Sequence, residues 1–473
     1  MTTPSDGHPS PDRDLTDQAG AVTGATRTLA SFGIVSDRTR DQTGAINAAV
    51  ERAKAQGIGT ILGEAQAVYA HKGPLRLDGI AFDGRGCTLR ATSPDQGTVF
   101  LSGKGTALRN VRLTGTSTKR GTQLTHCGLV VTASGFSISD VRIDADGAAK
   151  GFAGSGAMFF GAHDGSVARL RVEDTRADGI HVTHGSEDLS FMNCSVFASG
   201  DDGFAVVSYF GDGRTCRNIA TKDLVVADAH ARGLSIVGGQ AIHHLRPRIS
   251  RSSAAAIYVC SEDSFDTFGV RDWWIRDFTA SQCVTGIGLA RDFAQPIILL
   301  SGRDRPARLG ISSSVQDVSD GEIAGQVIGM GDRAACALDS NSAQLNRIRY
   351  ALKLNHIRGP HAAGYATLLG GRDCSGFIDI QECDGVPFIL SARMTGTHSY
   401  ERLTATDTRM ANPRLTDNIH GDGARHFTWL HIDLVGLTDA PGEALGGDID
   451  LKRTSWGQFH FNGQNLPSPA RPR

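Results

Sequence analysis

A nine-residue motif that occurs three times constrains the fold of this chain most strongly. The copies are VEDTRADGI, VFASGDDGF and VADAHARGL, which begin at Val172, Val196 and Val226. Each copy has an apolar residue, then a polar residue, a glycine and a bulky apolar residue. A short repeat of β-branched strands and glycine turns is typical of a solenoid. We therefore expect Asp178, Asp202 and Arg232 to stack in one column, about 4.8 Å apart, with Asp201 beside it.

Composition excludes several classes of protein. The 473 residues have a formal net charge of −2, whereas a nucleic-acid-binding protein needs a basic stripe. The 58 glycines against 15 prolines favour many turns and few helices. No apolar run is long enough to cross a bilayer. We therefore expect neither nucleic acid nor a membrane as a partner.

The cysteines and the first residues bear on metal binding and compartment. The nine cysteines are scattered and form no CxxC pair, so we expect no zinc site. The opening MTTPSDGHPSPDRDL is polar and has no apolar signal core. Either the protein stays in the cytoplasm or its export signal lies outside this sequence, and both alternatives remain open.

The chain reads as one domain with two tails. We expect a flexible N-terminal tail over residues 1–28, a solenoid over 29–445 with its N-terminal cap at 29–75, and a C-terminal tail over 446–473. A capping helix is predicted near residues 41–56, started by Asp41 or Thr43 and ended by Gly57. Its buried face should comprise Ile46, Ala49, Val50 and Ala53.

The capping segment resembles the opening of the pectate-lyase-like superfamily of right-handed parallel β-helices. The superfamily pattern FGAxGDGxTDDTxAIQxAI is matched here at Phe32–Gly33, Asp37, Thr39, Asp41 and Thr43–Ala45–Ile46, and departs at Arg38 and Arg40. This resemblance implies an all-β fold: a single-stranded right-handed parallel β-helix with a short N-terminal capping helix. Such a cap is needed because exposed strand edges would otherwise pair with other chains.

Three aspartates are expected to converge on two successive coils. Like charges close together raise one another's pKa, so that one carboxyl group stays protonated while another ionises. Glycoside hydrolysis needs such a pair, an acid for the leaving oxygen and a base for water. The alternative is that Asp178, Asp201 and Asp202 are solvated or cap backbone N–H groups at turns. Both aspartates of the column can face solvent only if the chain bends, which Gly179 and Gly203 would permit.

The same region resembles the polygalacturonase family, glycoside hydrolase family 28. The family motifs N-T-D-G, D-D and G-H-G-L-S-I-G are matched by Ala177–Asp178–Gly179, Gly200–Asp201–Asp202 and Arg232–Gly238. The resemblance implies that Asp201 is the general acid, that Asp178 and Asp202 activate water, and that the anomeric centre is inverted. It also implies a secreted or periplasmic location.

Two departures from that family concern the substrate. The family histidine is replaced by Arg232, and the Arg and Lys that hold the substrate carboxylate fall on Tyr258 and Cys260. A neutral sugar, or a uronate held by other groups, is therefore expected. Arg232 either pairs with Asp202 or binds a sugar. The other candidate substrate-binding residues, each with a structural alternative, are His181, Tyr209, Tyr258 and Glu262.

Two other functions remain open. The first is a polysaccharide lyase or uronate epimerase, in which Ca²⁺ neutralises the substrate carboxylate and Arg232 takes a proton. The second is a non-catalytic fibre or phage-tail module that binds glycans as a trimer. We thus expect a polysaccharide or oligosaccharide partner, a monomer or homotrimer, and no cofactor or metal unless the lyase alternative holds.

Overall fold

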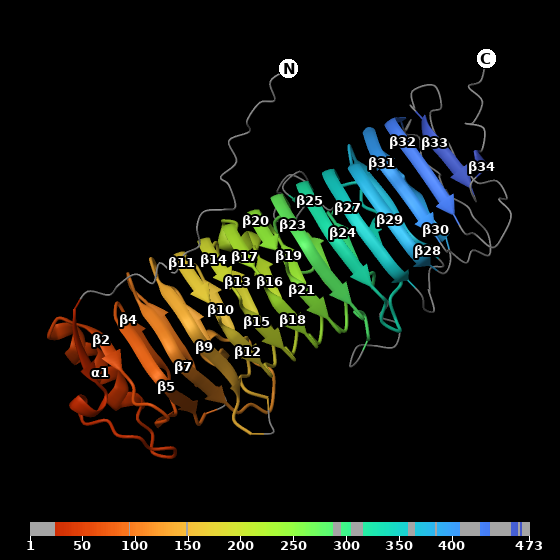
Figure 1. Cartoon of the computed structure of the whole chain (residues 1–473). Coiled ribbons are helices and arrows are strands. Elements are labelled where there is room, and N and C mark those ends of the chain that lie inside the picture. Colours follow the sequence, from red (N-terminus) through yellow and green to blue (C-terminus); the bar gives the residue numbers. More distant parts are fainter. Residues whose placement is uncertain are drawn as a thin grey trace.

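The computed structural model describes residues 24–93, 95–147, 150–286, 295–303, 316–357, 365–383, 386–406, 426–435, 456–461 and 464–465. The chain forms a parallel β-solenoid of about 11 turns, with one helix, α1, near its N-terminal end (Figure 1). The predicted fold, a right-handed parallel β-helix with a capping helix, is confirmed.

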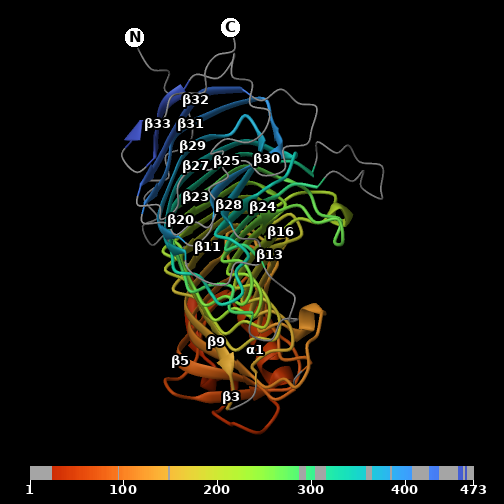
Figure 2. The same ribbon diagram turned by 90° about the vertical axis from the view of Figure 1, so that its right-hand side faces the viewer.

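Each coil contributes strands to three faces of the solenoid. Figure 2 shows the strands of the first face on the side opposite to those of the second. The first face is formed by β4 (Leu75–Asp78), β6 (Val99–Ser102), β8 (Leu129–Val131), β10 (Ala157–Phe160), β13 (Ile180–Thr183), β16 (Phe204–Val207), β19 (Leu234–Val237), β22 (Ile257–Cys260), β24 (Ile298–Ser301), β26 (Leu338–Ser340), β28 (Tyr365–Arg372) and β30 (Val386–Thr395).

The other two faces share their longest strands, which pair along both faces. The second face comprises β1 (Ala25–Thr28), β2 (Ile58–Leu62), β5 (Ala81–Ala91), β7 (Ala107–Gly115), β9 (Ser137–Ala145), β11 (His163–Ala168), β14 (Glu187–Met192), β17 (Arg217–Lys222), β20 (Gly239–Leu245), β23 (Val270–Ser281), β25 (Val318–Ile328), β27 (Leu345–Ile357), β29 (Ser375–Cys383), β31 (Thr397–Thr406), β32 (His426–Val435) and β33 (Trp456–Phe461). The third face adds β3 (Val68–His71), β12 (Arg171–Glu173), β15 (Ser195–Phe197), β18 (Val225–Ala227) and β21 (Arg248–Ser250).

The sequence motif corresponds to the stacking register of the coils. Val196 pairs with Val172 on one side and Val226 on the other, and Phe204 likewise pairs with Ile180 and Leu234. All six side chains are buried in one continuous core that runs along the solenoid. Burying such a side chain stabilises the fold by roughly 1.5–3 kcal/mol. The predicted repeat is therefore confirmed residue by residue.

The glycine of the motif is required by close packing. A Cβ at Gly203 would lie 2.3 Å from Cγ1 of Val226 and 2.6 Å from the carbonyl oxygen of Gly233. Gly179 meets the next coil in the same way, at 2.2 Å from Val196. Neither glycine has a positive φ. The expected bends are present at both glycines, and the missing Cβ also lets adjacent coils approach one another.

Left-handed backbone occurs at corners of the coils, some of them within a long strand, and many of the residues there are not glycine. Asp140, Arg169, Asp223 and Arg246 all have φ between 52° and 58°. Pairs of these residues in adjacent coils form two-pronged ion pairs: Arg169 with Asp140 at 2.7 and 2.8 Å, and Arg246 with Asp223 at 2.8 and 2.9 Å. Being exposed, each contributes about 0.2–1 kcal/mol.

The N-terminal cap matches its prediction closely. Helix α1 spans Thr43–Ala55, and the four residues predicted for its inner face are buried. Asp41 accepts hydrogen bonds from the backbone N–H of Thr43, at 3.0 Å, and from its hydroxyl, at 2.6 Å. Gly57 follows the helix with φ +66° and donates to Lys54 O. The helix packs on β2 and β4 of the first coils.

The ends of the described chain contain strands within both predicted tails. Strand β1 falls within residues 1–28, whose first 23 residues lie outside the described part. Strands β33 and β34 (Gln464–Asn465) fall within 446–473, and β33 continues the solenoid by pairing in parallel with β32. Among the described residues, no helix has the length and apolarity needed to cross a membrane.

Candidate active site

The column of polar residues lies at the turn between the third and first faces. Gly179 N donates to Asp202 O at 2.9 Å, Gly203 N donates to Arg232 O at 2.8 Å, and Gly233 N donates to Ala255 O at 2.9 Å. These bonds place Asp178, Asp202, Arg232 and Ala255 at equivalent positions of successive coils. The predicted column of Asp178, Asp202 and Arg232 is confirmed, and Ala255 occupies the equivalent position in the following coil.

The carboxylates of the column bond to the backbone of the next coil. Oδ1 of Asp178 accepts a hydrogen bond from the N–H of Asp202 at 3.0 Å, and Oδ1 of Asp202 accepts one from the N–H of Arg232 at 2.9 Å. One oxygen of each aspartate therefore satisfies a backbone donor that would otherwise lack a partner. These bonds support the alternative in which the aspartates cap backbone N–H groups.

The second oxygen of each carboxylate has a side-chain partner. Oδ2 of Asp178 lies 2.5 Å from Nδ1 of His181, and the hydroxyl of Ser235 donates to Oδ2 of Asp202 at 2.6 Å. Only 6% of Asp202 is exposed. Its burial raises its pKa to about 7; Arg232 opposes this shift, and the charges of Asp178 and Asp201 add to it. Asp202 therefore titrates much closer to neutral pH than an ordinary aspartate does.

Arg232 is held in a network with three residues. Its guanidinium lies 3.7 Å from Oδ1 of Asp202 and 3.4 Å from Oε1 of Glu262, and stacks 4.3 Å above the ring of Tyr258. The Tyr258 hydroxyl donates to Glu262 at 2.7 Å. Although burial alone would lower the pKa of Arg232, these negative neighbours, Asp202 foremost, raise it. The predicted substrate residues Arg232, Tyr258 and Glu262 therefore contact one another, and Arg232 covers one ring face of Tyr258.

Asp201 has a partner that sequence reasoning missed. The guanidinium of Arg120 forms an ion pair and a hydrogen bond with its carboxylate. Arg120 belongs to the loop between β7 and β8, which is fixed by the bonds from Arg176 to Ser117 O at 2.8 Å and from Gly121 N to Ala153 O at 2.8 Å. The 81-residue separation explains why no local pattern indicates this pair.

Two loops form a wall beside the column on the first face. Tyr209 directly precedes the 3-10 helix η3 (Phe210–Asp212), and its backbone forms a β-bridge with Thr267. Its half-buried side chain packs against a small apolar cluster, separate from the main core, to which Tyr258 belongs. Burial raises its pKa to about 12, helped by nearby carboxylates, first among them Asp178. The loop that carries Thr267 also presents Phe265, which is 61% exposed.

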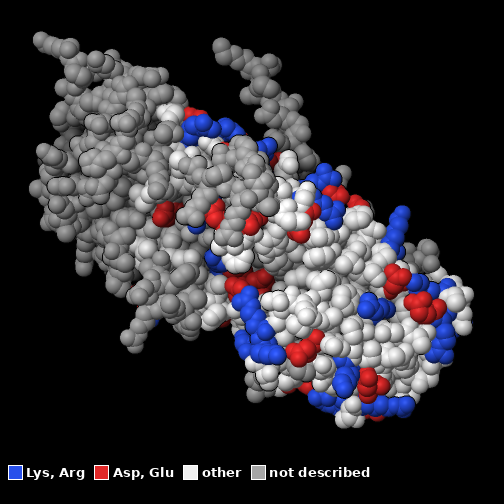
Figure 3. Space-filling view, turned by 180° about the vertical axis from the view of Figure 1, so that it is seen from behind, with Lys and Arg blue, Asp and Glu red and all other residues white. Residues whose placement is uncertain are grey.

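Lysine, arginine, aspartate and glutamate are interspersed on the face in Figure 3, in keeping with the small net charge. Within the described ranges, no group of three or more His, Cys, Asp or Glu side chains is arranged to hold a metal ion.

Comparisons with known proteins identify the fold. No family model matches the chain, and no curated protein matches it. Solved structures similar to it include the Agl-KA catalytic domain (TM-score 0.56, 14% identity, 88% of this chain and 70% of that chain). The catalytic domain of a GH87 alpha-1,3-glucanase in complex with tetrasaccharides is also similar, with a TM-score of 0.55 and 13% identity. The likeness covers 96% of this chain and 71% of that chain.

A surface adhesin of Streptococcus pneumoniae, PfbA, is also similar, with a TM-score of 0.51 and 11% identity over 82% of this chain and 89% of that chain. At these identities the likeness shows the fold alone, and the fold accommodates both catalytic domains and an adhesin. The chain has the parallel β-helix fold of these proteins.

Proposed function

We propose that this protein is a glycoside hydrolase that cleaves a polysaccharide or oligosaccharide with inversion. The observation that carries the proposal is the buried carboxyl group of Asp202, whose pKa is raised to about 7 by burial and by the charges of Asp178 and Asp201. Neighbouring carboxyl groups in different protonation states are the requirement for acid–base hydrolysis of a glycosidic bond. The likeness to glucanase catalytic domains adds support only at the level of the fold.

The contacts favour Asp202 as the general acid and Asp201 as the general base. A general acid must hold its proton near the working pH, as Asp202 does through burial. Asp201 is the most exposed of the three, with 27% of its side chain accessible, and Arg120 holds its carboxylate in an ion pair. Asp178, bound to His181, would orient the pair. This assignment exchanges the roles that the family resemblance implies for Asp201 and Asp202.

The lyase alternative is disfavoured by the environment of Arg232. A base must give up its proton, but Asp202 and Glu262 hold the guanidinium charged and raise its pKa. A lyase would release an unsaturated, ultraviolet-absorbing product and would lose activity in EDTA. Neither behaviour is expected here.

A glycan-binding module without turnover is a second candidate function. It is favoured by the ladder in which Asp178 and Asp202 accept backbone N–H groups, because such aspartates have a structural role without any chemistry. The surface adhesin with a similar fold adds support at the level of the fold only. This candidate predicts binding without cleavage.

The test begins with a screen of neutral and acidic polysaccharides by detection of new reducing ends, with NMR of the first products to assign their anomeric configuration. On a cleaved substrate, Asp202→Asn and Asp201→Asn should each lower kcat by roughly 10²–10⁴-fold. Aryl oligosaccharides with a nitrophenol leaving group then separate the roles. Such a leaving group needs no proton, so they should restore the rate of the acid variant, Asp202→Asn, and not that of Asp201→Asn.

Three outcomes would count against parts of this proposal. If nitrophenyl substrates rescue Asp201→Asn instead, the acid is Asp201 and only the exchange of roles is wrong. If both variants cleave at the wild-type rate, hydrolysis does not use this cluster. If glycans bind but no reducing ends appear, the binding module is the correct function.

A further inference from the structure

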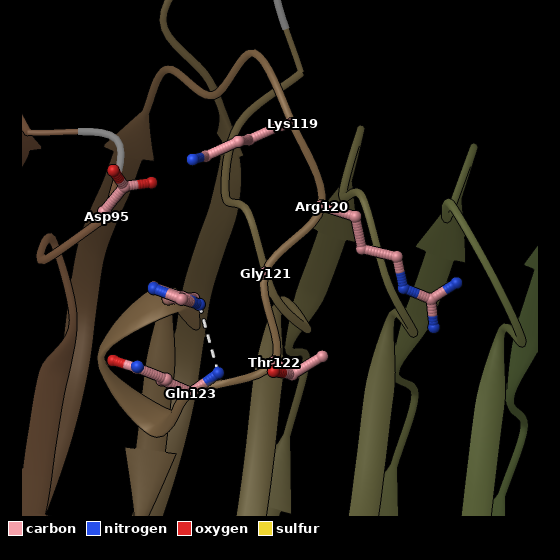
Figure 4. Close-up of a pocket in the computed structure, with 7 residues that line it drawn as sticks. Asp95, Lys119, Arg120, Gly121, Thr122 and Gln123 are labelled. Atoms are coloured by element: carbon pink, nitrogen blue, oxygen red, sulfur yellow. Dashed lines mark hydrogen bonds between the residues drawn. The ribbon is translucent and has the colours of Figure 1, made fainter.

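A pocket of about 320 Å³ lies beside the candidate active site, on the side of the earlier coils (Figure 4). This volume is near the lower end of the roughly 300–1,000 Å³ found for small-ligand sites, a size that suits one sugar unit. Its walls come from the loop between β7 and β8 and from the loop that precedes β6. The lining residues are Asp95, Lys119, Arg120, Gly121, Thr122, Gln123 and His126.

Lys119 supplies a positive charge to this pocket. It is exposed, and it forms no ion pair with any residue in the described part of the chain. Figure 4 shows its side chain directed toward the end of the pocket where Asp95 lies. Its ammonium group has three N–H donors, enough to contact both the carboxylate of Asp95 and an incoming anion.

His126 adds a neutral donor. Its Nδ1 accepts a hydrogen bond from the backbone N–H of Gln123 at 3.1 Å, the dashed line in Figure 4. An imidazole that accepts through Nδ1 carries its proton on Nε2, which therefore acts as a donor. The packing is tight, because a Cβ at Gly121 would come within 2.1 Å of this ring. His126 is consequently fixed in place.

Arg120 connects the pocket with the catalytic candidates. In Figure 4 its side chain leaves the loop away from Lys119, toward the strands of later coils. There it pairs with Asp201. Lys119 thus faces the pocket, whereas its neighbour Arg120 extends to the carboxylate cluster. A glycan whose scissile bond lies at Asp201 would therefore bring a neighbouring sugar unit toward Lys119.

We propose that this pocket binds an anionic substituent of the glycan, a carboxylate or a sulfate ester, one subsite away from the cleaved bond. The proposal rests on the proposed function and names its substrate class, an acidic glycan. Tyr258 and Cys260, where a family clamp would lie, are buried and carry no cationic group that could pair with an anion. Lys119 and His126 instead provide donors from the coils on the other side of the aspartates.

Titration calorimetry on the intact protein tests this inference without using catalysis. The probes are oligogalacturonides and oligomannuronates, each beside its carboxyl-reduced neutral form, and sulfated galactan oligosaccharides beside their desulfated forms. We expect at least one acidic probe to bind about tenfold more tightly than its neutral partner, a difference of about 1.4 kcal/mol. Comparison of the uronate probes with the sulfated probes identifies which anion the pocket recognises.

The variants localise the effect. Lys119→Ala should abolish the preference for the acidic probe, and Lys119→Arg should keep most of it. Lys104→Ala removes the same charge from an exposed position on another turn and should leave the preference unchanged. Equal binding of acidic and neutral probes, no binding of any acidic probe, or an equal loss in Lys104→Ala would overturn the inference. The proposed function fails separately, if Asp201 and Asp202 prove dispensable for cleavage of whichever polysaccharide the screen finds.

Discussion

The carboxylate of Asp202 accepts a hydrogen bond from the backbone N–H of Arg232, 2.9 Å away in the next coil, while its other oxygen receives the hydroxyl of Ser235. The side chain of Asp202 therefore takes part in the stacking of coils as well as in the carboxyl cluster. These two roles can be separated, because asparagine retains one oxygen acceptor for the N–H of Arg232 but loses the titratable carboxyl group and its charge beside the Arg232 guanidinium.

Replacing Asp202 should separate stability from activity. Asp202→Asn is expected to keep the free energy of unfolding within about 1 kcal/mol of wild type while kcat falls by 10²–10⁴-fold. Asp202→Ala should also destabilise the fold by about 1–3 kcal/mol, because it leaves the buried N–H of Arg232 without an acceptor. Urea denaturation and initial rates measure the two effects. Equal stability of both variants would contradict the role in coil stacking.

Stability should depend on pH through the same group. Because the pKa of Asp202 is raised to about 7, the folded protein retains a proton that the unfolded chain releases near pH 4. Its contribution to stability is thus present at low pH and is lost as pH rises through about 7. Asp202→Asn lacks this dependence. The stability of wild type relative to the variant should fall between pH 4 and pH 8 in urea titrations, and a constant difference would show that this group titrates normally.

Removing Arg120 should affect catalysis more than folding. Arg120→Ala leaves Asp201 without its ion-pair partner, and we expect kcat/KM to fall about tenfold, since misplacement of a catalytic group is costly. The free energy of unfolding should change by less than about 1 kcal/mol, because the pair is largely exposed. Arg217→Ala breaks a similarly exposed pair with Glu187 elsewhere on the solenoid and is the matched control. A similar kinetic loss in both variants would remove the special role of Arg120.

The glycine of the motif should be intolerant of a methyl group. Gly203→Ala would place Cβ 2.3 Å from Val226 and 2.6 Å from Gly233 O, and overpacking of this kind costs typically 1–3 kcal/mol. Gly44→Ala in α1 meets no atom within 4 Å and should stabilise the protein by roughly 0.4–1 kcal/mol. Thermal denaturation compares the two. A neutral Gly203→Ala would mean that the coils are less closely spaced than they are here.

Phe265 should contribute to glycan binding. It is exposed on the loop that also carries Glu262, and an aromatic ring there can stack on a sugar. We expect Phe265→Ala to raise KM several-fold with little change in kcat, since the contact is made equally in the ground and transition states. Val35→Ala, also exposed and apolar but in the N-terminal cap, is the control. An unchanged KM on all cleaved oligosaccharides would exclude this role.

The sequence by itself determined the solenoid, its capping helix and the column of Asp178, Asp202 and Arg232. These features follow from short-range patterns: apolar residues that alternate along strands, a helical stripe, and a motif whose repeats stack because each coil must bury its apolar residues against the next. The equivalence of Val172, Val196 and Val226 was visible for the same reason.

Only the tertiary structure decided the electrostatics of the site. Arg120 reaches Asp201 from 81 residues earlier, because the loop between β7 and β8 directs its side chain toward a later coil. The pKa of Asp202 depends on burial and on charges in three coils. Tyr258 and Arg232 cover one another because their coils are adjacent and their side chains share a face. Such relations depend on distances between coils. Because the loops differ in length, those distances cannot be read from a pattern along the chain.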